Sequence, residues 1–201
     1  MREEGIKAIW VRPYVRTTID PEFDTTKLRN ILNRDFNPVA PNTVWVTDIT
    51  YVHTLAGFVY LTSVMDLYSR KIIGWQLPDS LSTEHVVKAI EKAKANRSLG
   101  QPVVIHSDRG CQYVSKSYLE ATPAREYIRS YSNKGDPWDN ACIESFHALI
   151  KREWLNRYVI QNLKHAHELI FEYIDAFYNT VRIHGHCGMK SPHDFENALV
   201  S

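Results

Sequence analysis

A continuous apolar run at residues 103–105 indicates the fold class of this chain because of what surrounds it. The segment before it, residues 82–96, repeats apolar side chains every three to four positions behind a Ser or Thr, which predicts an amphipathic helix. A strand that follows a helix normally lies parallel to an earlier strand through a right-handed crossover, and a purely apolar run needs cover on both faces. We therefore expect an α/β protein with an interior strand at residues 102–108, which ends in Asp108.

Three further strands are predicted upstream of that helix. They share many β-branched and aromatic residues and are separated by short breaks: residues 44–54, 57–66 and 70–77. Short breaks favour antiparallel neighbours. The strand that ends in Asp108 is expected to lie beside the first of the three. Asp66, at the end of the second, is explained by a hairpin turn.

Two aspartates come together in this arrangement. Asp48 lies within the first predicted strand and Asp108 follows the fourth. Neighbouring strands are roughly 4.8 Å apart, so the two carboxylates can converge at one edge of the sheet. Ionised carboxylates so close repel each other, and one would take up a proton unless cations held them. Hard oxygen ligands favour magnesium or manganese, which predicts a divalent metal site.

A third carboxylate is expected from a helix that begins near Asp139 or Asn140, after a loop rich in Gly and Pro. Asn140 is predicted to cap this helix. The helical wheel gathers three apolar residues on the side expected to face the core: Cys142, Phe146 and Leu149. Glu144 and Lys151 share the opposite side, where the carboxylate can reach the cations and the lysine can reach a phosphate.

Composition limits the remaining possibilities. With 201 residues, 44% of them hydrophobic, the chain has enough apolar material for one main domain. A net charge of +1 means that any role with nucleic acid must rest on local basic patches or on metal ions. The three cysteines form no metal-type pair, the segment HGHCG therefore gives little support for zinc, and no apolar stretch is long enough to span a bilayer. We expect a protein of a reducing compartment, with no membrane partner.

Several sequence words around the three carboxylates resemble the insertion sequence three (IS-three) family of transposases, in particular its second-reading-frame protein with a DDE integrase catalytic core. The words that carry this resemblance are NRDF (33–36), PNTVWVTDITY (41–51), HSDRGCQY (106–113), KGDPWDNACIESF (134–146) and YNTVRIHG (178–185). They are linked at family spacing over nearly the whole chain.

This resemblance implies a ribonuclease-H-like fold, in which helices flank a five-stranded mixed sheet. It also implies in-line phosphoryl transfer on DNA with two divalent ions, Mg²⁺ or Mn²⁺. The residues that would be catalytic and bind the metal are Asp48, Asp108 and Glu144. Contacts to DNA are expected from Lys151, Arg152 and Lys134. His106 and Asn140 are expected to support the site.

The resemblance also predicts how the chain is divided. Residues 1–40 are expected to be a lead-in with the tail of a truncated helix-turn-helix module, residues 41–160 the catalytic core, and residues 161–201 a helical extension. The extension is predicted to contain a long amphipathic helix over 162–182, which packs on the core or on a partner. Its apolar stripe is Leu163, Ile170, Ile174, Phe177 and Val181. Pro123 is predicted to break the helix that relatives carry before the glutamate.

We therefore expect a transposase core that cuts and joins DNA at transposon ends in the bacterial cytoplasm, at the nucleoid when bound to DNA. Its expected partners are transposon-end and target DNA, further copies of itself on DNA, and a first-reading-frame protein that supplies helix-turn-helix DNA binding. One alternative is a stand-alone ribonuclease-H-like nuclease, which strand transfer from a free 3′-hydroxyl would exclude. Another is a catalytically silent DNA-binding or assembly module. The presence of all three carboxylates argues against a catalytically silent module, whereas the expected truncation of the helix-turn-helix module leaves that alternative open.

Overall fold

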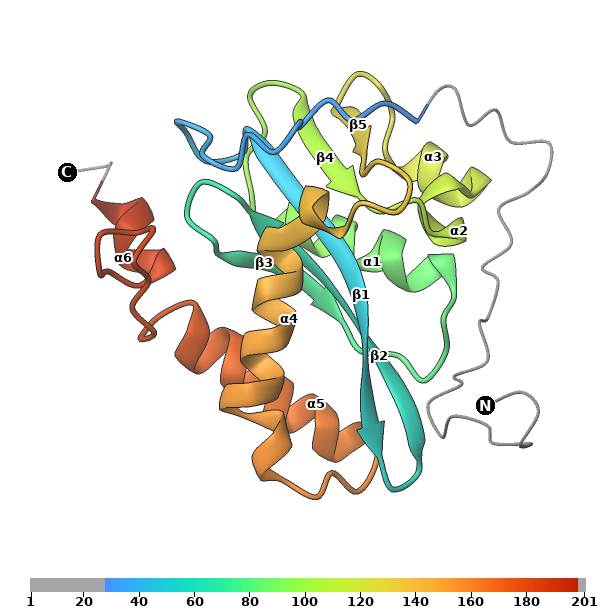
Figure 1. The fold of residues 1–201 in the computed structure, drawn as a ribbon, viewed down its shortest axis with the longest axis vertical. Helices are drawn as coiled ribbons and strands as arrows, with labels where there is room; N and C mark the ends of the chain where they lie inside the picture. Colours follow the sequence, from blue (N-terminus) through green and yellow to red (C-terminus); the bar gives the residue numbers. More distant parts are fainter. Residues whose placement is uncertain (1–27, 199–201) are drawn as a thin grey trace, which may run out of the picture.

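A five-stranded mixed sheet forms the centre of the fold, in the order β3–β2–β1–β4–β5 (Figure 1). The strands are β1 (Val44–Thr54), β2 (Gly57–Asp66), β3 (Ile72–Gln76), β4 (Val103–Ser107) and β5 (Tyr127–Tyr131). The computed structural model describes residues 28–198, so the expected helix-turn-helix remnant and the first part of the lead-in lie outside the described residues. The expected fold class is confirmed, and the third strand is shorter than predicted.

β1 is the central strand of the sheet and carries Asp48. It pairs with β2 in antiparallel fashion along nearly its whole length, but pairs in parallel with β4 only from Val44 to Val46. Beyond Val46 the pairing with β4 stops, and Asp48 lies two residues past that point. The predicted neighbourhood of the first and fourth strands is thus confirmed, with β4 between β1 and β5.

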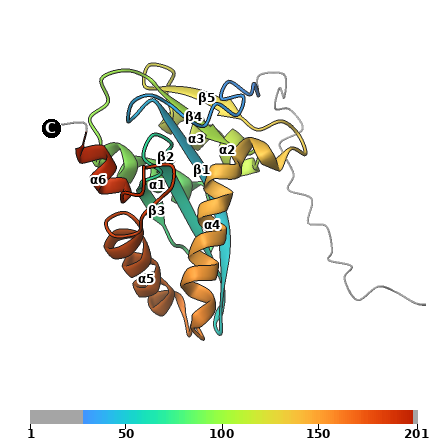
Figure 2. The same ribbon diagram turned by 60° about the vertical axis from the view of Figure 1, so that its left-hand side comes forward.

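Helices cover both faces of the sheet (Figure 2). The longest are α1 (Thr83–Ala95), α4 (Ala141–Glu153) and α5 (Leu163–Phe171). α1 packs on one face, whereas α4 and α5 pack on the other, and each layer has its own apolar core. Gly74 in β3 permits the close approach of α1, because a Cβ there would lie 2.3 Å from the carbonyl oxygen of Ala89. Within residues 28–198, none of the helices has the length and apolar character of a membrane span.

The core-facing stripe of α4 differs from the prediction. Its buried residues are Ile143, Phe146, His147 and Ile150. Phe146 is buried as expected, but Cys142 and Leu149 are only half-buried. The stripe of α4 that faces the sheet is therefore rotated about the helix axis from the predicted one, and His147 contacts Ser63 of β2. Glu144 is exposed, which confirms that the core does not occupy its face.

The predicted helix over 162–182 is interrupted and shorter. α5 continues into a π-helical segment, η4 (Glu172–Tyr178), and helical structure ends there. Because each π turn contains more residues than an α turn, the buried face shifts to Tyr173, Ile174 and Tyr178. Leu163, at the start of α5, and Val181, past the end of η4, are exposed, so their assignment to the stripe was wrong. The extension shares the core of the sheet, which confirms packing on the core.

The predicted helix break at Pro123 is confirmed. Two short helices, α2 (Cys111–Val114) and α3 (Lys116–Ala121), precede it. α3 stops before Pro123, whose carbonyl oxygen accepts the amides of Glu126 and Tyr127 in a tight turn. β5 starts directly after this turn. The proline therefore separates a helix from the edge strand.

Within the described part of the lead-in, residues 28–36 lie against the segment that leads into α4. Leu28 and Leu32 are buried, one in each of the two cores. Arg34 forms ion pairs with Asp136 and Asp139, two residues of the segment that leads into α4. We call residues 28–36 the strap. It ties the start of α4 to the rest of the molecule.

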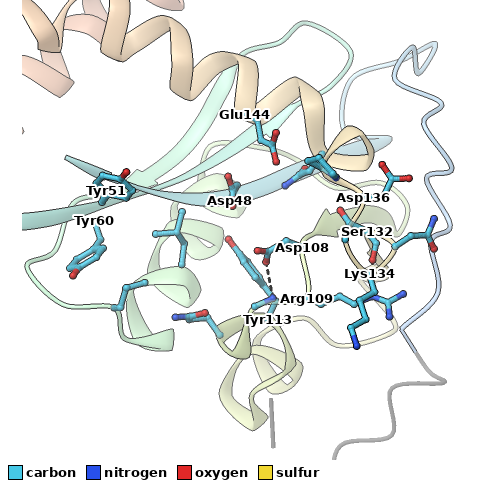
Figure 3. A pocket seen from close by; sticks show the side chains of 18 residues that line it. Asp48, Tyr51, Tyr60, Asp108, Arg109, Tyr113, Ser132, Lys134, Asp136 and Glu144 are labelled. Atoms are coloured by element: carbon cyan, nitrogen blue, oxygen red, sulfur yellow. Dashed lines mark hydrogen bonds between the residues drawn. The ribbon is translucent and has the colours of Figure 1, made fainter. Parts of the chain in front are cut away.

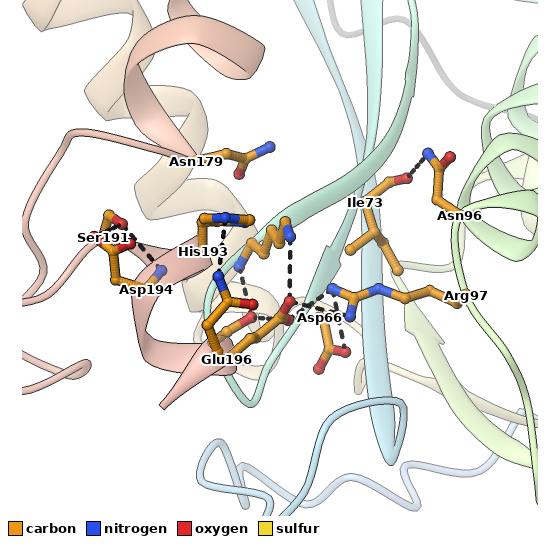
Figure 4. A network of polar contacts seen from close by, with 12 residues as sticks. Asp66, Ile73, Asn96, Arg97, Asn179, Ser191, His193, Asp194 and Glu196 are labelled. Atoms are coloured by element: carbon orange, nitrogen blue, oxygen red, sulfur yellow. Dashed lines mark hydrogen bonds and ion pairs between the residues drawn. The ribbon is translucent and has the colours of Figure 1, made fainter. Parts of the chain in front are cut away.

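The last helix, α6 (Pro192–Asn197), is tied to the sheet by a network of charges (Figure 4). Both carboxylate oxygens of Glu196 accept hydrogen bonds from Arg97, at 2.7 and 3.1 Å. Lys71 and Ser69 donate to the same carboxylate. Asp66, expected to be a turn residue, is fully buried beside this network and accepts the amides of Asn42 and Tyr68.

Candidate active site

The three predicted carboxylates line a single cavity of about 710 Å³. Asp48 comes from β1, Asp108 follows β4, and Glu144 lies in the first turn of α4. Figure 3 shows them gathered in the middle of the cavity, with Tyr51 and Tyr60 toward one end and Lys134 toward the other. Three elements that are distant in sequence thus deliver one acidic cluster, as the sequence predicted.

Local structure fixes the orientation of Asp108. The backbone amide of Gly110 donates a hydrogen bond of 2.9 Å to its Oδ1. A Cβ at Gly110 would lie 3.0 Å from the same oxygen, so a larger residue would press on the carboxylate. A side chain at position 110 would therefore displace this carboxylate by a few tenths of an ångström, whereas the φ of −59° would suit any residue.

Asp48 is held from the side of α4. The Oδ2 atom of Asp48 lies 3.4 Å from Nδ1 of His147, and Nε2 of this histidine lies 3.3 Å from the hydroxyl of Ser63. His147 is one helical turn beyond Glu144. One helix therefore supplies a carboxylate to the cavity and a contact to another.

The electrostatics of the cluster favour a bound cation. The pKa of Asp108 is raised to about 6, first because protein atoms surround most of the carboxyl group and then because the charge of Asp48 is near. The pKa of Glu144 is raised as well, first because the protein atoms around the cavity partly desolvate this otherwise exposed carboxylate and then because the charge of Asp48 is near. Asp48 is thus the common neighbour of the other two carboxylates. A divalent ion would relieve this repulsion, and hard carboxylate oxygens suit Mg²⁺ or Mn²⁺.

As the side chains stand, however, residues 28–198 contain no three His, Cys, Asp or Glu side chains arranged to hold one metal ion together. The carboxylates share a cavity without forming a closed ligand set. Asn140 adds a further oxygen to its lining, because its buried Oδ1 finds no hydrogen-bond partner among the described residues. The donor chemistry fits a divalent cation, and side-chain rotation would have to complete its coordination.

Comparison with known proteins agrees with this geometry. The family profile described as "Integrase core domain" matches residues 38–137, and a second profile with the same description matches residues 128–192. The chain belongs to the integrase core family. Among its relatives, the transposase for insertion sequence element IS904 of Lactococcus lactis is 37% identical over 167 residues, which are 83% of this chain and 66% of that protein.

Transposase InsF for insertion sequence IS3A of Escherichia coli is 38% identical over 170 residues, 84% of this chain and 58% of the relative. The integrase core described here thus spans about three fifths to two thirds of the length of these relatives. Its fold is also that of the HTLV-2 integrase catalytic core domain, solved in complex with magnesium in a trimeric form. That structure superimposes with a TM-score of 0.61 at 16% identity and covers 80% of this chain and 99% of the solved one.

The two predicted supporting residues of the integrase core differ in their positions. His106 is buried, and its ring nitrogens contact the hydroxyls of Ser130 (2.8 Å) and Ser132 (3.2 Å). Burial lowers its pKa to about 4, so the ring is neutral at pH 7 and links β4 to β5. Asn140 lines the cavity and donates to the carbonyl oxygen of Thr47 at 3.4 Å.

The predicted capping role of Asn140 is wrong. It occupies the residue before α4, but its side chain makes no capping hydrogen bond. A 3-10 turn, η2 (Pro137–Asn140), runs directly into α4, and Asp136 caps that turn by accepting the amide of Trp138. The helical hydrogen bonding therefore starts one turn earlier than the sequence pattern indicated, which frees Asn140 to face the cavity.

The three predicted DNA-binding residues also occupy different positions. Lys151 donates to the hydroxyl of Thr50 at 2.7 Å and lies 4.6 Å from the ring centre of Tyr51, beside the carboxylates. Lys134 lines the cavity at its opposite end. Arg152 is exposed on α4 and is not part of the cavity lining.

Several residues of the site were not singled out from the sequence. Tyr113 is buried beneath the carboxylates, and its hydroxyl lies 3.4 Å from that of Thr47. Arg109 lines the cavity and donates to the carbonyl oxygen of Ser132 at 2.7 Å. Both belong to the motif HSDRGCQY, which indicated that this segment lies at the site but did not indicate the roles of its individual residues. The contact of His147 with Asp48 had only a weak signal, its position one turn after Glu144.

Proposed function

We propose that this integrase core is the catalytic part of a transposase, which cuts DNA at transposon ends and transfers the cut strand to target DNA. The observation that carries this proposal is the convergence of Asp48, Asp108 and Glu144 from three elements into one cavity. The curated relatives are named transposases of insertion sequences, which supports DNA as the substrate. The solved catalytic core of HTLV-2 integrase contains magnesium, which supports a metal-dependent reaction.

In the proposed mechanism, the three carboxylates would hold two Mg²⁺ or Mn²⁺ ions. These ions would supply activation of the attacking water or 3′-hydroxyl and stabilisation of the leaving oxygen. The protein orients the ligands, because the Gly110 amide holds Asp108 and the imidazole of His147 lies against Asp48. His106 and Asn140 would support the site from its edge.

Lys151, beside Tyr51, and Lys134, toward the opposite end of the cavity, would contact the DNA backbone, and Arg152 would make a more distant contact. Phosphate contacts of this kind position DNA without identifying its sequence. Recognition of the transposon ends would come from a helix-turn-helix module supplied by a first-reading-frame protein. The integrase core would act as a homo-oligomer on DNA, in the bacterial cytoplasm and at the nucleoid. In this scheme residues 41–160 supply the chemistry, and the helices after residue 160 brace them.

The decisive experiment is a Mg²⁺-dependent cleavage and strand-transfer assay on labelled DNA duplexes. The unchanged protein is expected to cut DNA and to join a free 3′-hydroxyl to a second duplex, whereas Asp108→Asn is expected to do neither. Glu91→Gln is the matched control, because Glu91 is an exposed carboxylate of α1 outside the cavity. Cleavage without joining would favour the stand-alone nuclease, and metal-independent DNA binding without cleavage would favour the silent module.

A further inference from the structure

The cavity extends beyond the three carboxylates to an exposed aromatic cluster that the proposed chemistry leaves unused (Figure 3). Tyr51 of β1 and Tyr60 of β2 are directly opposite each other in the strand pairing, and both line the cavity. Phe58 packs against Tyr51, with ring centres 5.5 Å apart and the planes nearly perpendicular. We call these three residues the aromatic arm.

The aromatic arm presents ring surface to solvent. Tyr51 and Phe58 are each 51% exposed, although rings of this size normally contribute to a core. The reason lies in the sheet, because this part of β1 extends past its short pairing with β4. The edge-to-face contact holds the Tyr51 ring in place and leaves part of its surface free. The arm is therefore an ordered surface that lacks a partner in the described part of the chain.

A fixed positive charge accompanies these rings. Nζ of Lys151 lies 4.6 Å from the ring centre of Tyr51, and its hydrogen bond to Thr50 restrains it there. Ile49 and Leu81, which also line the cavity, are uncharged. An aromatic surface beside a single cation is complementary to a nucleotide, which combines a flat base with a charged phosphate.

We propose that the aromatic arm stacks unpaired nucleobases next to the phosphate that the acidic cluster acts on, while Lys151 contacts the phosphate of the stacked nucleotide. This inference rests on the proposed function for the position of that phosphate. A base inside a duplex is covered on both faces by its neighbours, so it cannot stack on Tyr51. The arm thus selects DNA whose bases are unpaired beside the cleavage point, such as a frayed end or a short single-stranded overhang.

The test compares a duplex that carries a short overhang, containing 2-aminopurine, with the fully paired duplex of the same sequence. Both are titrated without divalent metal, so that binding is separated from cleavage. We expect the overhang to bind about tenfold more tightly, as one stacked base would give, and 2-aminopurine fluorescence to fall. Tyr51→Leu should remove both effects, whereas Tyr51→Phe keeps the ring and should preserve them.

Two controls separate the outcomes. Phe171→Leu removes an aromatic ring that is 54% exposed on α5, outside the cavity, and should change neither binding nor fluorescence. Asp108→Asn should lose cleavage but retain the overhang preference, so failure of the chemistry and failure of the stacking are distinguished. If Tyr51→Leu is misfolded by circular dichroism, Phe58→Leu replaces it.

Equal binding of the two duplexes by the unchanged protein would overturn the proposal. So would undiminished quenching in a folded Tyr51→Leu protein. If Tyr51→Leu binds each duplex as tightly as the unchanged protein does, but sediments as a smaller particle than the unchanged protein, the aromatic arm contacts a second copy of the chain. The proposal is then also wrong.

Discussion

Nδ1 of His147 lies 3.4 Å from Oδ2 of Asp48, and this contact joins the helix of the site to its sheet. The same helix carries Glu144 into the cavity. Because the imidazole also contacts Ser63 of β2, its ring is fixed at both nitrogens. The orientation of one metal-ligand candidate therefore depends on how α4 is docked.

The first prediction concerns this contact. His147→Ala is expected to weaken Mg²⁺ binding and cleavage by about 10- to 100-fold, the usual effect of removing a side chain that orients a metal ligand. Mg²⁺ affinity is measured from the rise in thermal midpoint with Mg²⁺ concentration. His147→Gln, which retains a polar group in a similar volume, should lose less. Unchanged Mg²⁺ affinity in a folded His147→Ala protein would rule out the orienting role.

The second prediction concerns the repulsion among the carboxylates. In metal-free buffer at pH 7.5, Asp108→Asn should unfold at a higher temperature than the unchanged protein, because it removes a charge from the acidic cluster. Adding Mg²⁺ should stabilise the unchanged protein and have a smaller effect on Asp108→Asn. Thermal midpoints with and without EDTA provide the measurement.

The difference in thermal midpoint between Asp108→Asn and the unchanged protein should depend on pH. The pKa of Asp108 is about 6 in the folded chain, whereas the ordinary pKa of an aspartate is near 3.8. A raised pKa means that the carboxyl group favours the folded state while protonated, and that this contribution is lost as the pH rises through about 6. The advantage of Asp108→Asn should therefore be absent at pH 3.5 and complete above pH 6. An advantage that does not change with pH would argue for a cause other than ionisation.

The third prediction uses two glycines. Gly110→Ala should reduce cleavage by about tenfold while leaving folding intact, because its Cβ would crowd Asp108 Oδ1 and shift the carboxylate by a few tenths of an ångström. Gly100→Ala is the control, since a Cβ there meets no atom within 4 Å. Cleavage rates and thermal midpoints of both variants are compared with those of the unchanged protein. Equal cleavage by all three would show that this contact does not position Asp108.

The fourth prediction concerns the network around Glu196. Burial opposes ionisation of this group, but hydrogen bonds from Arg97 and Ser69 outweigh it and lower the pKa of Glu196. Glu196→Gln should therefore lower the free energy of unfolding by about 2 kcal/mol at pH 7. Because the pKa of Glu196 is lowered, its ionised carboxylate stabilises the fold at pH values above its ordinary pKa near 4.5, and this stabilisation is lost as the pH falls through the pKa of the folded state. The difference in unfolding free energy between Glu196→Gln and the unchanged protein should therefore shrink in acid.

Denaturant titrations at pH 7 and pH 3.5 measure this effect. Glu168→Gln, an exposed residue of α5, is the control and should be neutral at both pH values. A deficit of the same size at both pH values would mean that shape rather than charge makes Glu196 important.

The strands and the acidic cluster were predictable because they depend on local alternation and on one topological rule. The apolar run before Asp108 required an interior strand, and the intervening helix required a parallel neighbour for it. With Asp48 on that neighbour, convergence of the carboxylates follows. The helix break at Pro123 was predictable for the same reason, since the missing amide acts locally.

What escaped prediction depends on rotation and packing over long distances in the sequence. Whether Leu149 or Ile150 faces the sheet is a difference of 100° about the axis of α4, which only the contacting surface decides. The π-helical segment after Phe171 shifts the register in the same way. The contact of His147 with Asp48 depends on the rotation of α4 alone. The aromatic arm could not be predicted, because it depends on β1 extending past its pairing with β4.

The strap extends the proposed catalytic unit upstream of residue 41. Arg34 and Asn30 both contact Asp139, just before the helix that carries Glu144, and Leu32 fills part of the core beneath. A protein trimmed to begin at residue 41 would keep every candidate ligand, yet it would lose the residues that hold one of them in position. The proposed catalytic unit therefore begins upstream of all three carboxylates: the strap supplies none of the candidate metal ligands, yet it braces the helix that carries one of them.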